Sequence, residues 1–227
     1  MAGSEETLDP RDWTQMRALA HRAVDDAFGY LEHRREQPVW QAVPAPVAGQ
    51  FTAPLPRAPQ GAEAAYRDYR AWIEPYQMGN THPRFWGWYM GNGTALGAVG
   101  DFLAAVMNPN MGGGNHVGNL VESQVVDWCR QIVGMPEGTG GLLVSGGSMA
   151  NFVALAVARA ADDPERLRRE GVAGLPQPLA FYASTEVHSC MQKALEQLGH
   201  GSRSLRRIPV GADYRIDLAA LAAAVAA

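Results

Sequence analysis

The sequence of 227 residues contains two cysteines, Cys129 and Cys190, and a single lysine, Lys193. Two cysteines do not make a disulfide framework, and no histidine or cysteine spacing typical of a metal site is present, so we expect no metal. Every other basic side chain is an arginine. Chemistry that needs an amine is therefore restricted to Lys193 or the N-terminus.

Long apolar runs and basic stripes are also missing. No run of 18 apolar residues exists, which predicts no membrane span. The net charge is -4 and no RNA-binding signature is visible, which argues against nucleic acid as a main partner. The start, Met-Ala-Gly-Ser-Glu-Glu, is acidic and has no apolar core of a signal peptide, so we expect a cytoplasmic protein. A hydrophobic content of 47% allows a sizeable core.

The N-terminal third predicts helices joined by an extended strap. Asp9 and Pro10 form a good helix start, and the helix is expected to run to about Gln37. Residues 38–61 contain six prolines and few apolar clusters, which predicts an extended connector that wraps a second subunit. A short helix is expected over residues 62–73.

Residues 142–151 read Leu-Leu-Val-Ser-Gly-Gly-Ser-Met-Ala-Asn. The apolar start predicts a buried strand over 142–144, and an apolar, alanine-rich helix is expected over 149–161. A strand, a glycine turn and a helix together present free backbone N–H groups to an anion. We interpret Gly146, Gly147 and Ser148 as a phosphate cradle. A plain strand-to-helix turn and a nucleophile elbow with Ser148 are the alternatives.

Aromatic residues gather in a second informative stretch, residues 81–94, which contains Phe85, Trp86, Trp88 and Tyr89. Aromatic side chains beside a glycine-rich loop suit a planar ligand or an aromatic substrate, and a plug of the core is the alternative interpretation. A helix is expected over 95–107, a glycine-rich loop over 108–116, and a helix over 120–133. The residues expected to face inward on this last helix are Val121, Val125, Trp128 and Ile132.

The C-terminal third alternates strands and helices. A polar connector over 162–178 is followed by a predicted strand over 179–183, a helix over 189–198, a strand over 204–210 and a helix that starts at Asp217. This order indicates a mostly parallel α/β sheet. Ligands of such sheets bind at the carboxyl ends of the strands, where 145–148 and 186–189 are both expected.

Three motifs together resemble the pyridoxal-phosphate-dependent group II amino-acid decarboxylases, the family of the aromatic-L-amino-acid, histidine and glutamate enzymes. They are Ser-Gly-Gly-Ser-Met-Ala-Asn at 145–151, Thr-Glu-Val-His-Ser at 185–189 and His-Pro-Arg-Phe-Trp-Gly at 82–87. The loop Asn-Pro-Asn-Met-Gly-Gly-Gly-Asn-His at 108–116 looks like a bacterial branch. The resemblance covers about residues 9–227 and implies a fold-type I α/β homodimer that uses pyridoxal 5'-phosphate to release CO2 from an L-amino acid.

The resemblance also assigns roles to residues. It implies that Gly146, Gly147 and Ser148 hold the cofactor phosphate, that Gly91 lies near it, and that His188 stacks on the pyridine ring and helps to protonate the carbanion centre. An imidazole offers both a flat face and a proton that titrates near neutral pH. Trp88, Tyr89, Asn110 and Met111 match positions around the substrate, the last two in a loop that reaches the neighbouring subunit.

The family's Schiff-base lysine and the aspartate beside the pyridine nitrogen both belong to a region that follows the part matched here. We therefore expect an N-terminal part of such an enzyme, inactive alone, with a wrapping segment at 1–93 and the first part of the large α/β domain at 94–227. Lys193 lies five residues after His188 on the same expected helix, which places it roughly 140° from His188 around the axis. An aromatic or large apolar substrate is expected, and aldehyde-forming oxidative decarboxylation stays open.

Two rival interpretations come from other classes of protein. In a serine hydrolase, Ser148 would be the nucleophile, His188 or His200 the base, and residues 112–114 the oxyanion loop. In a non-catalytic half-protein, the fold would serve only to bind a partner, which the single lysine in the wrong place favours.

Overall fold

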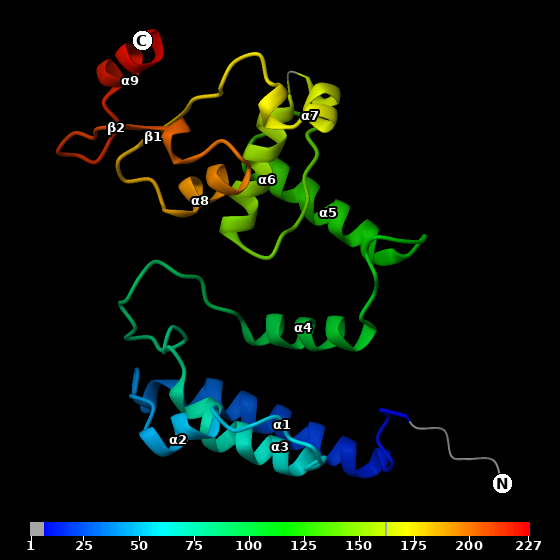
Figure 1. Cartoon of the computed structure of the whole chain (residues 1–227). Coiled ribbons are helices and arrows are strands. Elements are labelled where there is room, and N and C mark those ends of the chain that lie inside the picture. Colours follow the sequence, from blue (N-terminus) through cyan, green and yellow to red (C-terminus); the bar gives the residue numbers. More distant parts are fainter. Residues whose placement is uncertain (1–6, 162) are drawn as a thin grey trace. The chain divides into compact units, whose positions relative to one another are not determined.

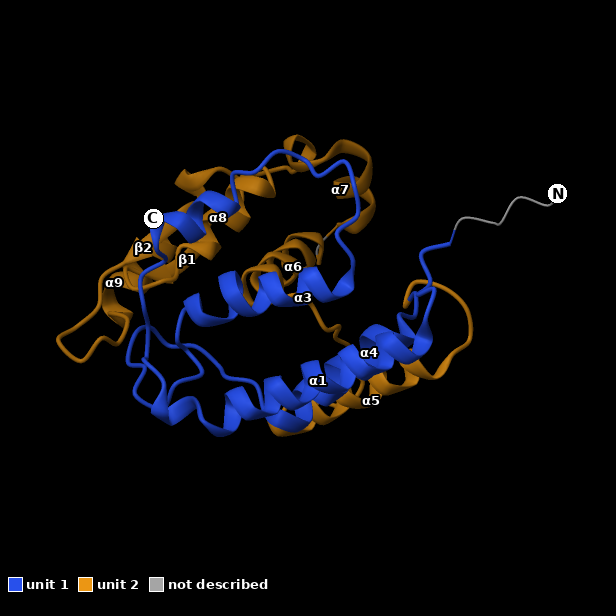
Figure 2. Ribbon diagram, turned by 90° about the horizontal axis from the view of Figure 1, so that it is seen from below, with its two compact units in different colours: residues 1–110 blue, residues 111–227 orange. Residues whose placement is uncertain are grey.

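The computed structural model describes residues 7–161 and 163–227 (Figure 1). The acidic residues 1–6, from which we inferred that no signal peptide is present, lie outside this part. The chain divides into two compact units, residues 1–110 and 111–227 (Figure 2). The expected domain boundary after residue 93 stays a prediction. None of the helices in the described part combines the length and apolar character needed to cross a membrane.

The first unit begins with helix α1 (Trp13–Glu32), which is shorter than predicted at both ends. Its N-cap is Asp12, whose Oδ1 accepts the backbone N–H groups of Thr14 at 2.8 Å and Gln15 at 3.1 Å. The predicted cap at Asp9 is wrong because this stronger pair of bonds lies three residues later. A 3₁₀ turn (Arg34–Glu36) follows the helix.

The connector is not entirely extended, because Pro44 initiates a short helix α2 (Ala45–Gln50). Helix α3 (Ala62–Asp68) continues as a π-helical turn (Tyr69–Ile73) and a 3₁₀ turn (Glu74–Tyr76), close to the predicted bounds. It lies beside α1 (Figure 1), where the Tyr66 hydroxyl donates to Asp26 Oδ2 at 2.6 Å. Burial, together with this bond, raises the pKa of Tyr66 to about 12. Helix α4 (Ala95–Met107) has the bounds that were predicted.

The second unit starts with α5 (Val117–Ile132) and α6 (Gly147–Ala160), two helices that the sequence predicted. The predicted strand over 142–144 is wrong, because these residues form no ladder with another strand. Leu142 and Leu143 are more than half exposed, and the Leu143 N–H donates to Glu122 Oε1 at 3.1 Å. The connector before the sheet contains helix α7 (Pro164–Glu170), capped by Asp163, and a 3₁₀ turn (Val172–Gly174), which were not predicted.

A parallel strand pair confirms the α/β prediction. Strand β1 (Phe181–Ser184) pairs with β2 (Leu205–Ile208) in the register Phe181 with Leu205, and α8 (Cys190–Gln197) forms the crossover between them. A 3₁₀ turn (Ser202–Ser204) leads into β2, and α9 (Leu218–Ala226) follows it. Consecutive parallel strands need such a helical crossover.

The core of this unit lies between α8 and β2. Its buried side chains come from one face of α8, the residue after it, and the first and last positions of β2: Cys190, Ala194, Leu195, Leu198, Leu205 and Ile208. The predicted inward face of α5 is wrong for three of its four residues, since Val121, Trp128 and Ile132 are 53%, 53% and 83% exposed, whereas Val125 is half-buried. Helix α8 packs against α6, and the Asn151 amide at the start of α6 contacts Cys190 at the start of α8.

Candidate functional site

The glycine turn before α6 keeps its backbone open. Gly146 is the N-cap residue with φ 149°, a conformation that favours glycine, and no side chain caps the helix. The N–H groups of Gly147, Ser148 and Met149 therefore have no acceptor within the helix. A Cβ atom added at Gly146 or Gly147 would meet nothing within 4 Å. The turn thus offers uncapped donors, the Ser148 hydroxyl and the positive end of a helix dipole to an anion.

His188 lies in the turn between β1 and α8 and is exposed. Two backbone bonds hold this turn: Thr185 N–H donates to Ile208 O at 2.9 Å, and Val187 N–H donates to Ser184 O at 3.1 Å. The Nδ1 atom of His188 accepts the backbone N–H of Cys190 at 3.2 Å. With Nδ1 used as an acceptor, the neutral imidazole holds its proton on Nε2.

Asn151, which we did not single out from the sequence, connects the two segments. It lies in the first turns of α6, and its Nδ2 donates to Gly147 O at 3.0 Å and to Cys190 Sγ at 3.4 Å. The glycine turn and the His188 turn are therefore adjacent at the starts of α6 and α8. A signal was present in the sequence, since asparagine is a poor residue for a helix interior unless its amide finds partners.

The hydrolase arrangement has no support in the geometry. In the described part of the chain, no hydrogen bond joins Ser148 to His188 or to His200. The His200 ring packs against Phe181 with ring centres 5.0 Å apart, and its Nε2 is buried without a partner. Burial, and then the charge of Arg159, lowers the pKa of His200. A base needs a hydrogen bond to its nucleophile, so Ser148 lacks the second member of a triad.

Lys193 is exposed in α8, as predicted. The expected angle of roughly 140° between Lys193 and His188 is wrong, because His188 precedes α8 by two residues and does not lie on the helix. The backbone N–H of Lys193 donates to Ser189 O at 3.2 Å, within the first turn of α8.

The aromatic loop belongs to the first unit. Trp88 and Tyr89 are 78% and 108% exposed, Gly91 has open space around it, and Trp88 adopts a left-handed φ of 51°. Phe85 lies under the loop with its ring 6.5 Å from that of Trp88. These residues do not form the core plug that was the alternative interpretation.

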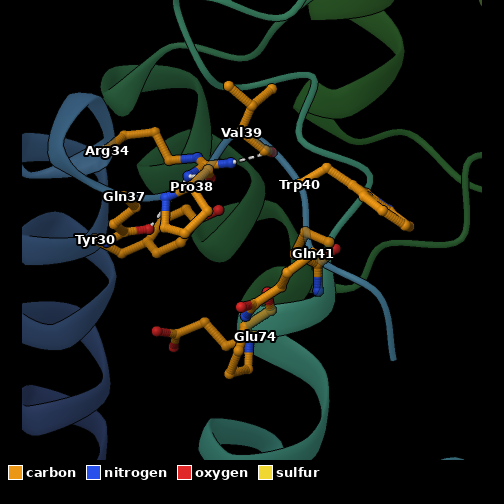
Figure 3. A pocket seen from close by; sticks show the side chains of 10 residues that line it. Tyr30, Arg34, Gln37, Pro38, Val39, Trp40, Gln41 and Glu74 are labelled. Atoms are coloured by element: carbon orange, nitrogen blue, oxygen red, sulfur yellow. Dashed lines mark hydrogen bonds between the residues drawn. The ribbon is translucent and has the colours of Figure 1, made fainter. Parts of the chain in front are cut away.

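Arg34 connects the base of this loop to the start of the connector, residues 38–61. The Arg34 side chain is buried and donates to Thr81 Oγ1 at 3.2 Å. It also donates to Pro38 O at 2.8 Å and Val39 O at 3.0 Å, two residues drawn in Figure 3. It lines a pocket of about 240 Å³ that contains none of the predicted site residues. Buried His82 continues the anchor, since its Nδ1 accepts the Arg84 N–H at 3.0 Å.

Asn110 ends the first unit and Met111 begins the second. The glycine at position 118 makes room for Met111, since a Cβ there would lie 2.8 Å from Met111 Sδ. The structure brings together Gly146, Gly147, Ser148 and His188 in the second unit, whereas Trp88, Tyr89 and Gly91 belong to the first. The assembly of the two groups into one site stays a prediction.

The chain matches one family model, the pyridoxal-dependent decarboxylase conserved domain, over residues 44–227. Among curated proteins, it is 31% identical to tryptophan decarboxylase 1 of Oryza sativa subsp. japonica over all of this chain and 47% of the relative. It is 27% identical to the aromatic-L-amino-acid decarboxylase of Bacillus atrophaeus over 91% of this chain and 42% of the relative.

Among solved structures, the chain resembles the crystal structure of Oryza sativa TDC with PLP and tryptamine. The TM-score is 0.78 and the identity 27%, over 96% of this chain and 46% of that one. The decarboxylase domain of a Vibrio parahaemolyticus protein shares the fold, with a TM-score of 0.78, at 17% identity over 96% of this chain and 49% of that one. These neighbours establish a fold-type I architecture, and the chain spans about half the length of the relatives that it matches.

Proposed function

This chain belongs to the pyridoxal-dependent decarboxylase family, and we propose that it forms the phosphate-binding half of an enzyme that releases CO2 from an L-amino acid. The observation on which this proposal depends most is the uncapped N-terminus of α6, which lies beside the His188 turn through Asn151 and Cys190. The proposed cofactor is pyridoxal 5'-phosphate. It supplies the electron sink that makes loss of a carboxylate possible.

The residues of the glycine turn fit a phosphate group. Three N–H groups at the start of α6 have no partner within the helix, and the side-chain-free face of Gly146 and Gly147 lets an anion approach the backbone. The Ser148 hydroxyl adds a fourth donor. Gly91 is proposed as a further contact from the first unit, in agreement with the open space around it.

His188 is proposed to lie flat against the cofactor ring and to move a proton. Its exposed ring is free to receive a planar group, and its Nδ1 bond to the Cys190 N–H leaves the proton on Nε2. The Nε2 atom is therefore the ring atom proposed to face the substrate carbon and to take part in proton transfer there.

An aromatic or large apolar substrate is proposed because of the exposed rings of Trp88 and Tyr89, with Asn110 and Met111 completing the pocket. Relatives named tryptophan decarboxylase 1 and tyrosine decarboxylase 2, from Oryza sativa and Narcissus pseudonarcissus, support this class. The aldehyde-forming variant of the reaction stays open, since a phenylacetaldehyde synthase of Arabidopsis thaliana is 30% identical over 87% of this chain and 41% of the relative.

The amine that the chemistry needs is proposed to come from outside these residues, because the exposed Lys193 is the only lysine. It would lie in a C-terminal half, continuous or on a separate chain, and the enzyme would be a cytoplasmic homodimer of the bacterial branch without membrane or nucleic-acid partners. The exposed apolar side chains of α5 support such a covering segment. The non-catalytic alternative predicts that mixing this chain with a separate C-terminal half releases no CO2.

The substitution Gly147→Asp tests the phosphate site. A carboxylate in the first turn of α6 repels an anion, so the variant should lose pyridoxal-phosphate affinity while keeping its fold. Equilibrium dialysis measures the affinity and circular dichroism the fold. Gly49→Asp, at another glycine with open space around it, is the matched control and should bind normally. Unchanged affinity in a folded Gly147→Asp protein would refute the assignment.

A further inference from the structure

Three hydrogen bonds lead from the glycine turn to His188. Asn151 Nδ2 donates both to Gly147 O at 3.0 Å and to Cys190 Sγ at 3.4 Å. The next bond runs from the Cys190 N–H to His188 Nδ1 at 3.2 Å. The side chain of Asn151 is thus the polar link between the first turn of α6 and the first residue of α8.

The link lies at the edge of the packed core. Cys190 is 7% exposed and Asn151 is half-buried, so water has little access to the bond between them. His188 itself is exposed, and the hydrogen bond described for its ring is the one from the Cys190 N–H. The orientation of the His188 ring therefore depends on the position of Cys190, the first residue of α8.

We propose that Asn151 is a positioning residue that sets the imidazole of His188 relative to the phosphate-binding turn. This inference depends on the proposed function, which it extends by naming what fixes the distance between the two halves of the cofactor site. The two donors of one amide are fixed relative to each other, so the positions of Gly147 O and Cys190 Sγ are fixed as well.

A bond from an amide to sulfur is weak. Its loss should therefore change the geometry of the start of α8 more than the stability of the whole chain. When α8 loosens, the Cys190 N–H no longer holds His188 Nδ1, and the proton can occupy either ring nitrogen. The proposed donor atom, Nε2, then loses its proton in part of the molecules.

The variant Asn151→Ser separates the two bonds of Asn151. A serine hydroxyl in a helix can still donate to the carbonyl four residues earlier, which is Gly147 O, but it is too short to reach Cys190 Sγ. The control is Val157→Ala on the same helix, where the native side chain is 65% exposed.

The first measurement is the rate at which iodoacetamide alkylates Cys190 in the full chain, with the exposed Cys129 as internal reference. Asn151→Ser should increase the ratio of the two rates about two- to five-fold, the effect of losing one weak hydrogen bond. Val157→Ala should leave it unchanged. The second is the 15N spectrum of the histidine rings, in which His188 should change from the Nε2–H tautomer to a mixture.

In the complete holoenzyme, Asn151→Ser should lower kcat while the affinity for pyridoxal phosphate stays within about two-fold of wild type. If the ratio of alkylation rates and the His188 spectrum do not change, the positioning role is refuted even if the cofactor binds at the turn. If both change but the wild-type turn binds no pyridoxal phosphate, the proposed function fails and the link itself stands. Should Asn151→Ser not fold, Cys190→Ala removes the same bond, and the His188 spectrum decides.

Discussion

Gly79 is the glycine with the strictest steric requirement at the base of the aromatic loop. Its φ is +92°, and a Cβ atom there would lie 2.1 Å from the backbone oxygen of Val39. That oxygen also accepts a bond from Arg34 at 3.0 Å, so it cannot move away without breaking the anchor. The position therefore tolerates no side chain.

The variant Gly79→Ala should reduce the free energy of unfolding by about 2 kcal/mol or more, because left-handed strain and a backbone clash add. Gly61→Ala is the matched control, since Gly61 has a similar φ of +83° but open space around it. It should cost about 1 kcal/mol. Thermal unfolding of both variants measures the difference, and equal losses would show that the contact with Val39 is unimportant.

His188 is the residue whose role is most directly chemical. In the complete enzyme, His188→Ala should slow turnover by about 10² or more, as for loss of a positioned acid, while pyridoxal-phosphate affinity decreases far less. His21→Ala, at an exposed histidine of α1, is the control and should have no effect on either quantity. Near-normal turnover of His188→Ala would leave His188 as an ordinary turn residue.

At the scale of elements, His200 joins three of them. It follows α8, its ring packs against Phe181 of β1, and Arg159 of α6 lies close enough to lower its pKa further. The Arg159 guanidinium also donates to Leu198 O at 2.7 Å, at the end of α8. The neutral form of His200 is therefore the one that this junction accommodates.

The pH dependence of stability follows from this shift. Burial lowers the folded pKa of His200 below the ordinary 6.5, so the unfolded chain binds the proton first as pH falls. The free energy of unfolding should decrease as pH falls through 6.5. His200→Gln should show a shallower decrease in urea titrations between about pH 7.5 and 5.5. Equal slopes for the two proteins would contradict the burial of a neutral imidazole.

The elements show where sequence patterns are sufficient and where they fail. Helix α4 has the predicted bounds, and β1 was predicted from a short apolar run, although its partner β2 contains two arginines and is not apolar throughout. The run at 142–144 looked equally good and is not a strand. An apolar run indicates a strand only if another strand is available to bond it, and that is a property of tertiary structure.

The candidate site, like the secondary structure, was predictable only in part. Glycine and histidine motifs located Gly146, Gly147, Ser148 and His188, which the fold places at the starts of two packed helices. The link through Asn151 could not be predicted, because it depends on the packing of α6 against α8 and on a bond to a cysteine 39 residues away. Local patterns indicate candidate ligand-binding groups, whereas the contacts that connect these groups depend on long-range packing.

At the scale of the whole molecule, the buried core is small for the apolar content of the sequence. Hydrophobic residues make up 47% of the sequence, yet Leu195 is the only large side chain that is fully buried among the described residues. Amphipathic patterns predicted which face of α5 is apolar, but not what covers it. A chain that spans about half the length of its relatives leaves such faces exposed.

The central claim is that this chain binds pyridoxal phosphate through its phosphate and not through an amine. The measurement is binding of pyridoxal phosphate and of pyridoxal to the full chain, followed by borohydride reduction, peptide mass mapping and a CO2-release assay with a panel of amino acids. We predict weak binding of pyridoxal phosphate that inorganic phosphate competes with, weaker binding of pyridoxal, no stoichiometric labelling of Lys193 and no turnover. Equal binding of both compounds, or specific labelling of Lys193 with turnover, would contradict the account.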